Sequence, residues 1–76
     1  MNTNNQKPEF CIIGCGRLGI TLAAFLSKQG FVPVAFSSKN RASARKAVAL
    51  IGAGQVYEDP VEAVKTCDLI FITTPD

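Results

Sequence analysis

The 76-residue chain is long enough for one small domain, since a chain of this length buries only about 60% of its unfolded surface. Hydrophobic residues make up 47% of the chain and charged residues 18%, which is typical of a globular protein and not of a disordered one. The net charge of +2, without a dense basic run, does not indicate nucleic acid or a membrane surface as a partner. No apolar stretch approaches the roughly 20 residues of a membrane span, and the N-terminus lacks the pattern of a secretory signal, so we expect a cytoplasmic protein.

The three cysteines, Cys11, Cys15 and Cys67, lack the spacing of a zinc site or of a disulfide framework, which favours reduced thiols. Cys11 and Cys67 fall in or beside apolar strands, where cysteine behaves as a small buried hydrophobic residue. Cys15 lies close to the start of the first expected helix, which could lower the pKa of its thiol, but the chain has no histidine to act as its base. We therefore do not expect Cys15 to be a nucleophile.

The first elements are a strand and a helix. Residues 1–8 are polar and aperiodic, which predicts a flexible lead-in to a domain over residues 9–76. The run Glu9–Ile13 is short, apolar and β-branched, which predicts a buried strand. A helix is expected from about Arg17 to Gln29, closed by Gly30, with an apolar face that includes Leu18, Leu22, Phe25 and Leu26.

A second strand and helix follow. The run Phe31–Phe36 predicts a strand, in which Pro33 cannot donate a ladder hydrogen bond and should face a bulge or an unpaired side. Residues 40–51 carry Ala44, Val48 and Ile51 at helical spacing and are followed by glycines, which predicts the second helix.

The rest of the chain completes an alternating pattern. Residues 55–57 can form a short third strand, Asp59 and Pro60 are typical of a helix start before a short helix over 61–66, and residues 68–74 form a strongly apolar fourth strand. Strands that alternate with helices through right-handed crossovers predict an α/β, Rossmann-like parallel sheet in the order 3-2-1-4. Because the fourth strand would be a bare edge, we expect this to be the N-terminal, incomplete part of a larger domain.

The glycine-rich segment Gly14-Cys15-Gly16-Arg17-Leu18-Gly19 lies between the first strand and the first helix, a context that favours dinucleotide binding over an ordinary turn. Gly14 would allow a sharp turn, Gly16 a close approach of the backbone to a pyrophosphate, and Gly19 close packing of helix on strand. The N–H groups of the first helical turn, including that of Leu18, favour the phosphates. Arg17 either adds charge at that rim or is simply solvated.

The end of the second strand indicates which dinucleotide binds. Proteins that bind NAD usually place an acid there, roughly 20 residues beyond the glycines, on the 2′-hydroxyl of the adenosine ribose. Here Ser37-Ser38-Lys39-Asn40-Arg41 contains no acid. Hydroxyls, a lysine and an arginine can donate to a 2′-phosphate, so NADP is favoured over NAD, with Ser37 or Ser38 and Arg41 on the phosphate and Lys39 as an auxiliary. The same loop can also be explained as a helix cap, with Ser38 or Asn40 at the N-cap position.

With these segments and the run Asp68–Asp76 in view, the chain resembles the N-terminal NADP-binding domain of a superfamily of oxidoreductases. The superfamily includes pyrroline-5-carboxylate reductase, 6-phosphogluconate dehydrogenase, 3-hydroxyisobutyrate dehydrogenases and deazaflavin-linked NADP reductases. The resemblance implies that Thr73, Thr74 and Pro75 line the cofactor site after the fourth strand, although a proline-turned strand end explains them equally well. It also implies that a later helical domain, absent here, supplies the small-molecule substrate site and the catalytic residues and forms a homodimer.

Three functions follow from these observations. The leading hypothesis is the cofactor-binding half of an NADP-dependent oxidoreductase. A module that senses NAD(P) or ADP-ribose without turnover is the alternative, because fold does not determine function. Methyl transfer from S-adenosylmethionine also uses a glycine loop, but it usually places an acid at the position that Ser37 occupies.

Overall fold

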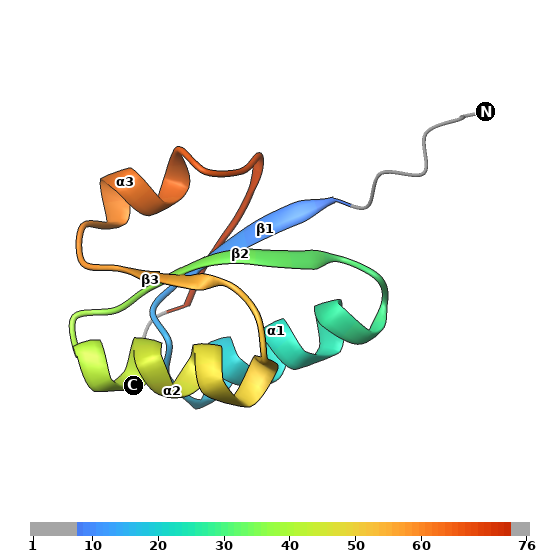
Figure 1. Cartoon of the computed structure of the whole chain (residues 1–76), viewed down its shortest axis with the longest axis horizontal. Coiled ribbons are helices and arrows are strands. Elements are labelled where there is room, and N and C mark those ends of the chain that lie inside the picture. The colour runs from blue at the N-terminus through green and yellow to red at the C-terminus, as the bar shows by residue number, and fades with distance from the viewer. Residues whose placement is uncertain (1–7, 74–76) are drawn as a thin grey trace.

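A computed structural model describes residues 8–73 of the chain, which form a parallel four-stranded sheet with helices on both faces (Figure 1). The strand order is β3-β2-β1-β4, as the sequence predicts. The elements in chain order are β1 (Glu9–Ile13), α1 (Arg17–Lys28), β2 (Val32–Ser37), α2 (Arg41–Ile51), β3 (Gln55–Tyr57), α3 (Pro60–Val64) and β4 (Leu69–Ile72). The boundaries differ from the sequence prediction mainly at α3 and β4, which are shorter than expected.

The irregularity expected at Pro33 is present in the pairing of β1 with β2. Phe10 lies opposite Pro33, but the next residue, Cys11, lies opposite Ala35, so that Val34 has no partner on β1. The extra residue in β2 accommodates a proline that cannot donate to the ladder.

The side chains of β1 alternate between two hydrophobic cores. Phe10 and Ile12 belong to the larger core beneath α1 and α2, whereas Cys11 packs with Ala35 and Ala63 on the face that α3 covers. In Figure 1, α1 and α2 lie on one side of the sheet and α3 on the other. β1 is therefore buried on both faces, as expected for a central parallel strand.

The apolar face predicted for α1 is partly wrong. Gly19, Ala23 and Leu26 are the buried residues of this helix, whereas Leu18 and Phe25 are 64% and 58% exposed. The buried residues follow one another at i, i+4 and i+7, a stripe that lies about 100° around the helix from Leu18 and Phe25. Two of the three residues on this buried stripe, Gly19 and Ala23, are small.

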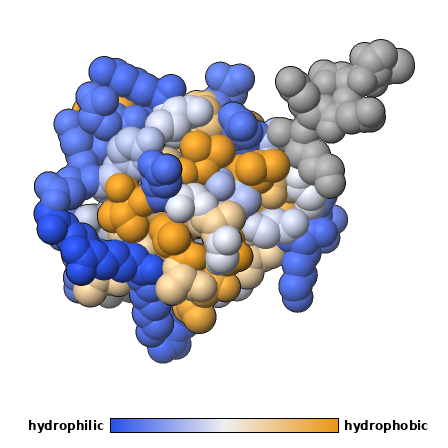
Figure 2. All heavy atoms as spheres, in the orientation of Figure 1, coloured by the Kyte–Doolittle hydropathy of each residue, from blue (hydrophilic) through white to orange (hydrophobic). Residues whose placement is uncertain are grey.

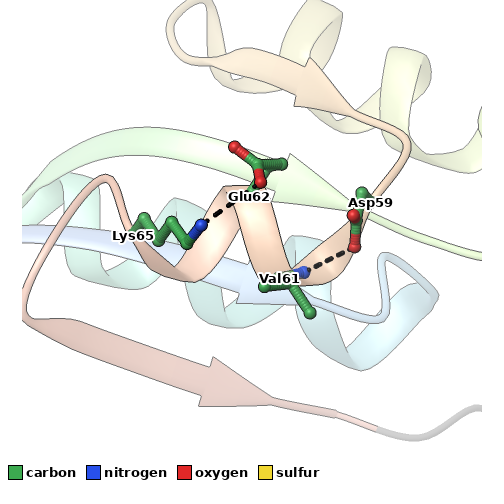
Figure 3. A network of polar contacts seen from close by, with 4 residues as sticks. All are labelled: Asp59, Val61, Glu62 and Lys65. Carbon is green, nitrogen blue, oxygen red and sulfur yellow. Dashed lines mark hydrogen bonds and ion pairs between the residues drawn. The ribbon is translucent and has the colours of Figure 1, made fainter.

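Asparagine and aspartate cap α2 and α3. The Asn40 side-chain oxygen accepts a hydrogen bond from the Ala42 N–H at 2.9 Å, and the Asp59 carboxylate accepts one from the Val61 N–H at 2.9 Å (Figure 3). Asn40 is therefore the N-cap residue of α2 and Asp59 that of α3. Both caps agree with the sequence prediction, since short polar side chains satisfy the free N–H groups of a first turn.

Hydrophobic atoms gather over the middle of the molecule in the view of Figure 2, with hydrophilic atoms around the outline. At the β4 edge, Ile70 and Ile72 are 41% and 72% exposed. Ile70 pairs with Cys11 and Ile72 with Ile13. Because both isoleucines are exposed, the β4 edge of the sheet is open to solvent within residues 8–73. None of the helices within residues 8–73 has the length and hydropathy of a membrane-spanning segment.

Candidate functional site

The glycine loop lies where three parallel strands end, and hydrogen bonds from β2 and from the end of β4 hold it there. The Gly14 N–H donates to the Ser37 carbonyl oxygen at 2.8 Å, which ties the loop to the end of β2. The Thr73 N–H donates to the Ile13 carbonyl oxygen at 2.8 Å, and the Thr73 hydroxyl donates to the carbonyl oxygen of Gly14. The carboxyl ends of β1, β2 and β4 therefore meet around this loop, the place where open α/β sheets bind ligands.

Glycine is required at two positions of the loop for different reasons. Gly14 has a φ of +95°, and a Cβ at this position would overlap the carbonyl oxygen of Thr73. A Cβ at Gly19 would overlap the carbonyl oxygen of Gly14 and lie 3.0 Å from the Thr73 hydroxyl oxygen. These contacts agree with the turn role expected for Gly14 and the packing role expected for Gly19.

The N-terminus of α1 carries no side-chain cap. Gly16 is the N-cap residue with a φ of −82°, no side chain of the described residues bonds to the first-turn N–H groups there, and the first turn contains no acid. Arg17 and Leu18 are exposed at this end of the helix. The helix start thus keeps the donors and the positive end of the dipole that favour an anion.

Cys15 is buried inside the loop and is not a reactive thiol. Its side chain is 1% exposed, and Sγ donates to the Ser37 carbonyl oxygen at 3.5 Å. Burial raises the pKa of the Cys15 thiol to about 11, so the helix N-terminus does not produce a thiolate. Burial, together with the neighbouring Cys67 thiol, likewise raises the pKa of Cys11 to about 12. Neither residue has the lowered pKa that a nucleophilic cysteine needs.

A cleft of about 250 Å³ lies beside the ends of β2 and β3. Its lining combines the β2–α2 connection and the start of α2 with the end of β3 and the residue after it, namely Ser38, Lys39, Arg41, Val56, Tyr57 and Glu58. Three of the four residues expected to contact a ribose phosphate thus share one cleft, whereas Ser37 is 1% exposed and does not line it.

The β3 side of this cleft is not among the residues that the sequence predicts at the site. Ser37 of β2 lies opposite Tyr57 of β3, so the chain leaves both strands at the same edge of the sheet. Glu58 forms an ion pair with Arg41, and both residues line the cleft. The sequence contains a signal for this position of Glu58. Parallel strands end at the same edge of a sheet, and Glu58 directly follows the third strand.

The remaining residues expected at the site follow β4. Thr73 bonds through its backbone N–H to Ile13, at the end of β1, and through its hydroxyl to Gly14 of the glycine loop. Thr74 and Pro75 lie outside the described residues.

The comparisons with known proteins agree with this architecture. Residues 9–76 match the family described as NADP oxidoreductase coenzyme F420-dependent. A protein from Bacteroides fragilis assigned as an NADP oxidoreductase is 26% identical, with a TM-score of 0.80 over 92% of this chain and 27% of its own. The WlbA dehydrogenase from Chromobacterium violaceum, solved with NADH and UDP-GlcNAcA, is 22% identical and shares the fold, with a TM-score of 0.81 over 95% of this chain and 22% of its own. No curated protein matches the chain at a significant level.

The chain thus spans about a quarter of the length of these solved structures. The family match covers nearly all of the chain, and the fold is that of a Rossmann-like, dinucleotide-binding domain of oxidoreductases. The chain therefore belongs to the family of coenzyme F420-dependent NADP oxidoreductases.

Proposed function

We propose that the chain is the NADP-binding part of an NADP-dependent oxidoreductase. The observation that carries the proposal is the position of the glycine loop, held at the carboxyl ends of β1, β2 and β4 beside a helix start without a side-chain cap. A cleft lined by Lys39 and Arg41 lies beyond the end of β2. The glycine loop suits the pyrophosphate of a dinucleotide, and the cleft suits a phosphate on the 2′ position of its adenosine ribose.

The glycine loop would hold the pyrophosphate. Gly16 has no side chain to stand between the backbone and a phosphate, and the first-turn N–H groups of α1 would donate to the phosphate oxygens. The exposed Arg17 side chain would add a positive charge at the rim. Tight packing at Gly14 and Gly19 would hold these donors in place, because neither position can move away from Thr73 without breaking contacts.

The cleft would hold the 2′-phosphate of the adenosine ribose. Arg41 presents a forked set of donors that matches a phosphate, and the Ser38 hydroxyl and the Lys39 ammonium line the same space. Ser37 would contribute through its backbone, since its side chain is buried and its carbonyl oxygen supports the glycine loop. This set of donors supports NADP over NAD.

The nicotinamide of a bound cofactor supplies hydride transfer, and the described residues would bind and orient it. Thr73, at the end of β4, would support the loop beneath the pyrophosphate. We propose that the groups that bind the small-molecule substrate and exchange its proton lie in a further part of the polypeptide, which would also form the homodimer.

Two substitutions test the proposal in the full-length protein by isothermal titration with NADPH and NADH. Gly16→Val places a side chain beside the pyrophosphate site, and the negative φ of Gly16 is compatible with valine, so we expect binding of both nucleotides to be lost without a large change in melting temperature. Arg41→Ala is expected to weaken NADPH binding by about tenfold or more and to leave NADH binding nearly unchanged.

Ala53→Val is the matched control, because Ala53 is exposed in the connection after α2 and does not line the cleft. It should bind both nucleotides as the unmodified protein does. Equal affinities of the unmodified protein for NADPH and NADH would refute the assignment of the 2′-phosphate. Nucleotide binding that survives Gly16→Val would refute the assignment of the glycine loop.

A further inference from the structure

Glu58 places a carboxylate in the cleft that otherwise collects positive charge. It directly follows β3, and the pairing of Ser37 with Tyr57 brings it beside the β2–α2 connection. Its carboxylate forms an ion pair with the guanidinium of Arg41, and both residues line the cleft. The acid absent from the end of β2 is therefore supplied by the residue that follows the neighbouring strand.

The ion pair can open at little cost. The side chains of Arg41 and Glu58 are 52% and 67% exposed, and an ion pair between such solvated groups contributes little to the stability of a protein. Arg41 is therefore available to a ligand. Glu58 itself lines the cleft, so its negative charge remains beside the cleft when the ion pair with Arg41 opens.

The two ligands that differ at the ribose 2′ position respond to this carboxylate in opposite ways. A phosphate carries about two negative charges, so it competes with Glu58 for the donors of Arg41 and is repelled by the carboxylate. A 2′-hydroxyl can donate a hydrogen bond to the same carboxylate, which is how acids at this end of a Rossmann sheet bind the ribose of NAD. Lys39 and Arg41 thus favour the phosphate, and Glu58 opposes them.

We propose that Glu58 is a specificity-determining residue that weakens binding of a 2′-phosphorylated ribose and allows the same cleft to accept a free 2′-hydroxyl. The inference rests on the proposed binding of a nicotinamide dinucleotide. Two opposed charges thus line one cleft, that of Arg41 on α2 and that of Glu58 after β3. Replacing the acid by a neutral side chain of the same shape shifts the preference further toward NADPH.

The test compares Glu58→Gln with Glu62→Gln in the full-length protein by titration with NADPH and with NADH at one fixed ionic strength. Glu62 is the matched control, because it is also an exposed glutamate in an ion pair, with Lys65 at 3.4 Å, but lies on α3 and does not line the cleft (Figure 3). Both substitutions raise the net charge by one. Any difference in nucleotide affinity between the two variants therefore comes from the position of the lost charge and not from the change in net charge.

We expect Glu58→Gln to tighten NADPH binding about fivefold and to leave NADH binding unchanged or weaker, with Glu62→Gln like the unmodified protein. Raising the salt concentration should reduce the gain, because both side chains are solvated. If Glu58→Gln and Glu62→Gln have the same ratio of NADPH to NADH affinity while the unmodified protein still prefers NADPH, the role of Glu58 is refuted and the proposed function stands. If the unmodified protein binds neither nucleotide, the proposed function fails and the role of Glu58 with it.

Discussion

The fold needs glycine either for a positive φ or for lack of space beside the Cα atom, and three glycine-to-alanine substitutions separate these two reasons. Gly52 has a φ of +85° with no atom within 4 Å of the position of a Cβ, so Gly52→Ala introduces backbone strain alone. Gly19 lies in α1, where its Cβ would overlap the Gly14 carbonyl oxygen, so Gly19→Ala introduces crowding alone. Gly14, with a φ of +95° and the Thr73 carbonyl oxygen in the way, combines both.

The expected losses follow from these surroundings. An alanine in the left-handed region costs about 1 kcal/mol, which is the whole effect at Gly52. Crowding against backbone atoms that cannot rotate away costs about 2–3 kcal/mol at Gly19, offset by up to about 1 kcal/mol from the higher helix propensity of alanine. At Gly14 the two effects add to about 3 kcal/mol or more, a large share of the stability of a small domain.

Urea denaturation of the full-length variants, followed by circular dichroism, measures the free energy of unfolding of each. We expect the stability to fall in the order Gly52→Ala, Gly19→Ala, Gly14→Ala, with Gly14→Ala the least stable. Thermal denaturation should place the melting temperatures of the three variants in the same order. A Gly14→Ala variant no less stable than Gly52→Ala would show that the contact between the loop and Thr73 is not close, and would refute the reasoning.

Two further predictions concern a cap and a buried thiol. Asn40→Ala removes the acceptor for the Ala42 N–H and should lower the free energy of unfolding by about 1 kcal/mol, whereas Asn40→Asp, which can still cap, should lose less; equal losses in urea denaturation would contradict the capping role. Burial raises the pKa of Cys15 from 9.0 to about 11, so the folded protein keeps this proton to higher pH than the unfolded chain does, and stability should hold below pH 9 and fall between pH 9 and 11. The melting temperature of Cys15→Ser should decline less over that interval, and an identical decline in both proteins would argue against a buried neutral thiol.

Much of the fold follows from local signals in the sequence. The alternation of apolar strands with helical patterns, the caps at Asn40 and Asp59 and the glycines that end the first two helices act over a few residues each, so the sequence alone predicts the elements and their order. The right-handed crossover rule then leads to the observed strand order. The placement of the glycine loop between β1 and α1 is local in the same sense, because it depends on the immediate neighbours of Gly14 to Gly19.

Only the tertiary structure decided which surfaces meet. The sequence could not show that α1 turns Gly19 and Ala23 to the sheet and leaves Leu18 and Phe25 exposed, because all apolar positions of an isolated helix look alike until a neighbour is placed against one stripe. The pairing of β2 with β3 brings Glu58 to Arg41 although they are 17 positions apart in the chain. The contact of Thr73 with Gly14 spans 59 residues. Contacts of this range depend on the register and spacing of the assembled sheet, which no local pattern encodes.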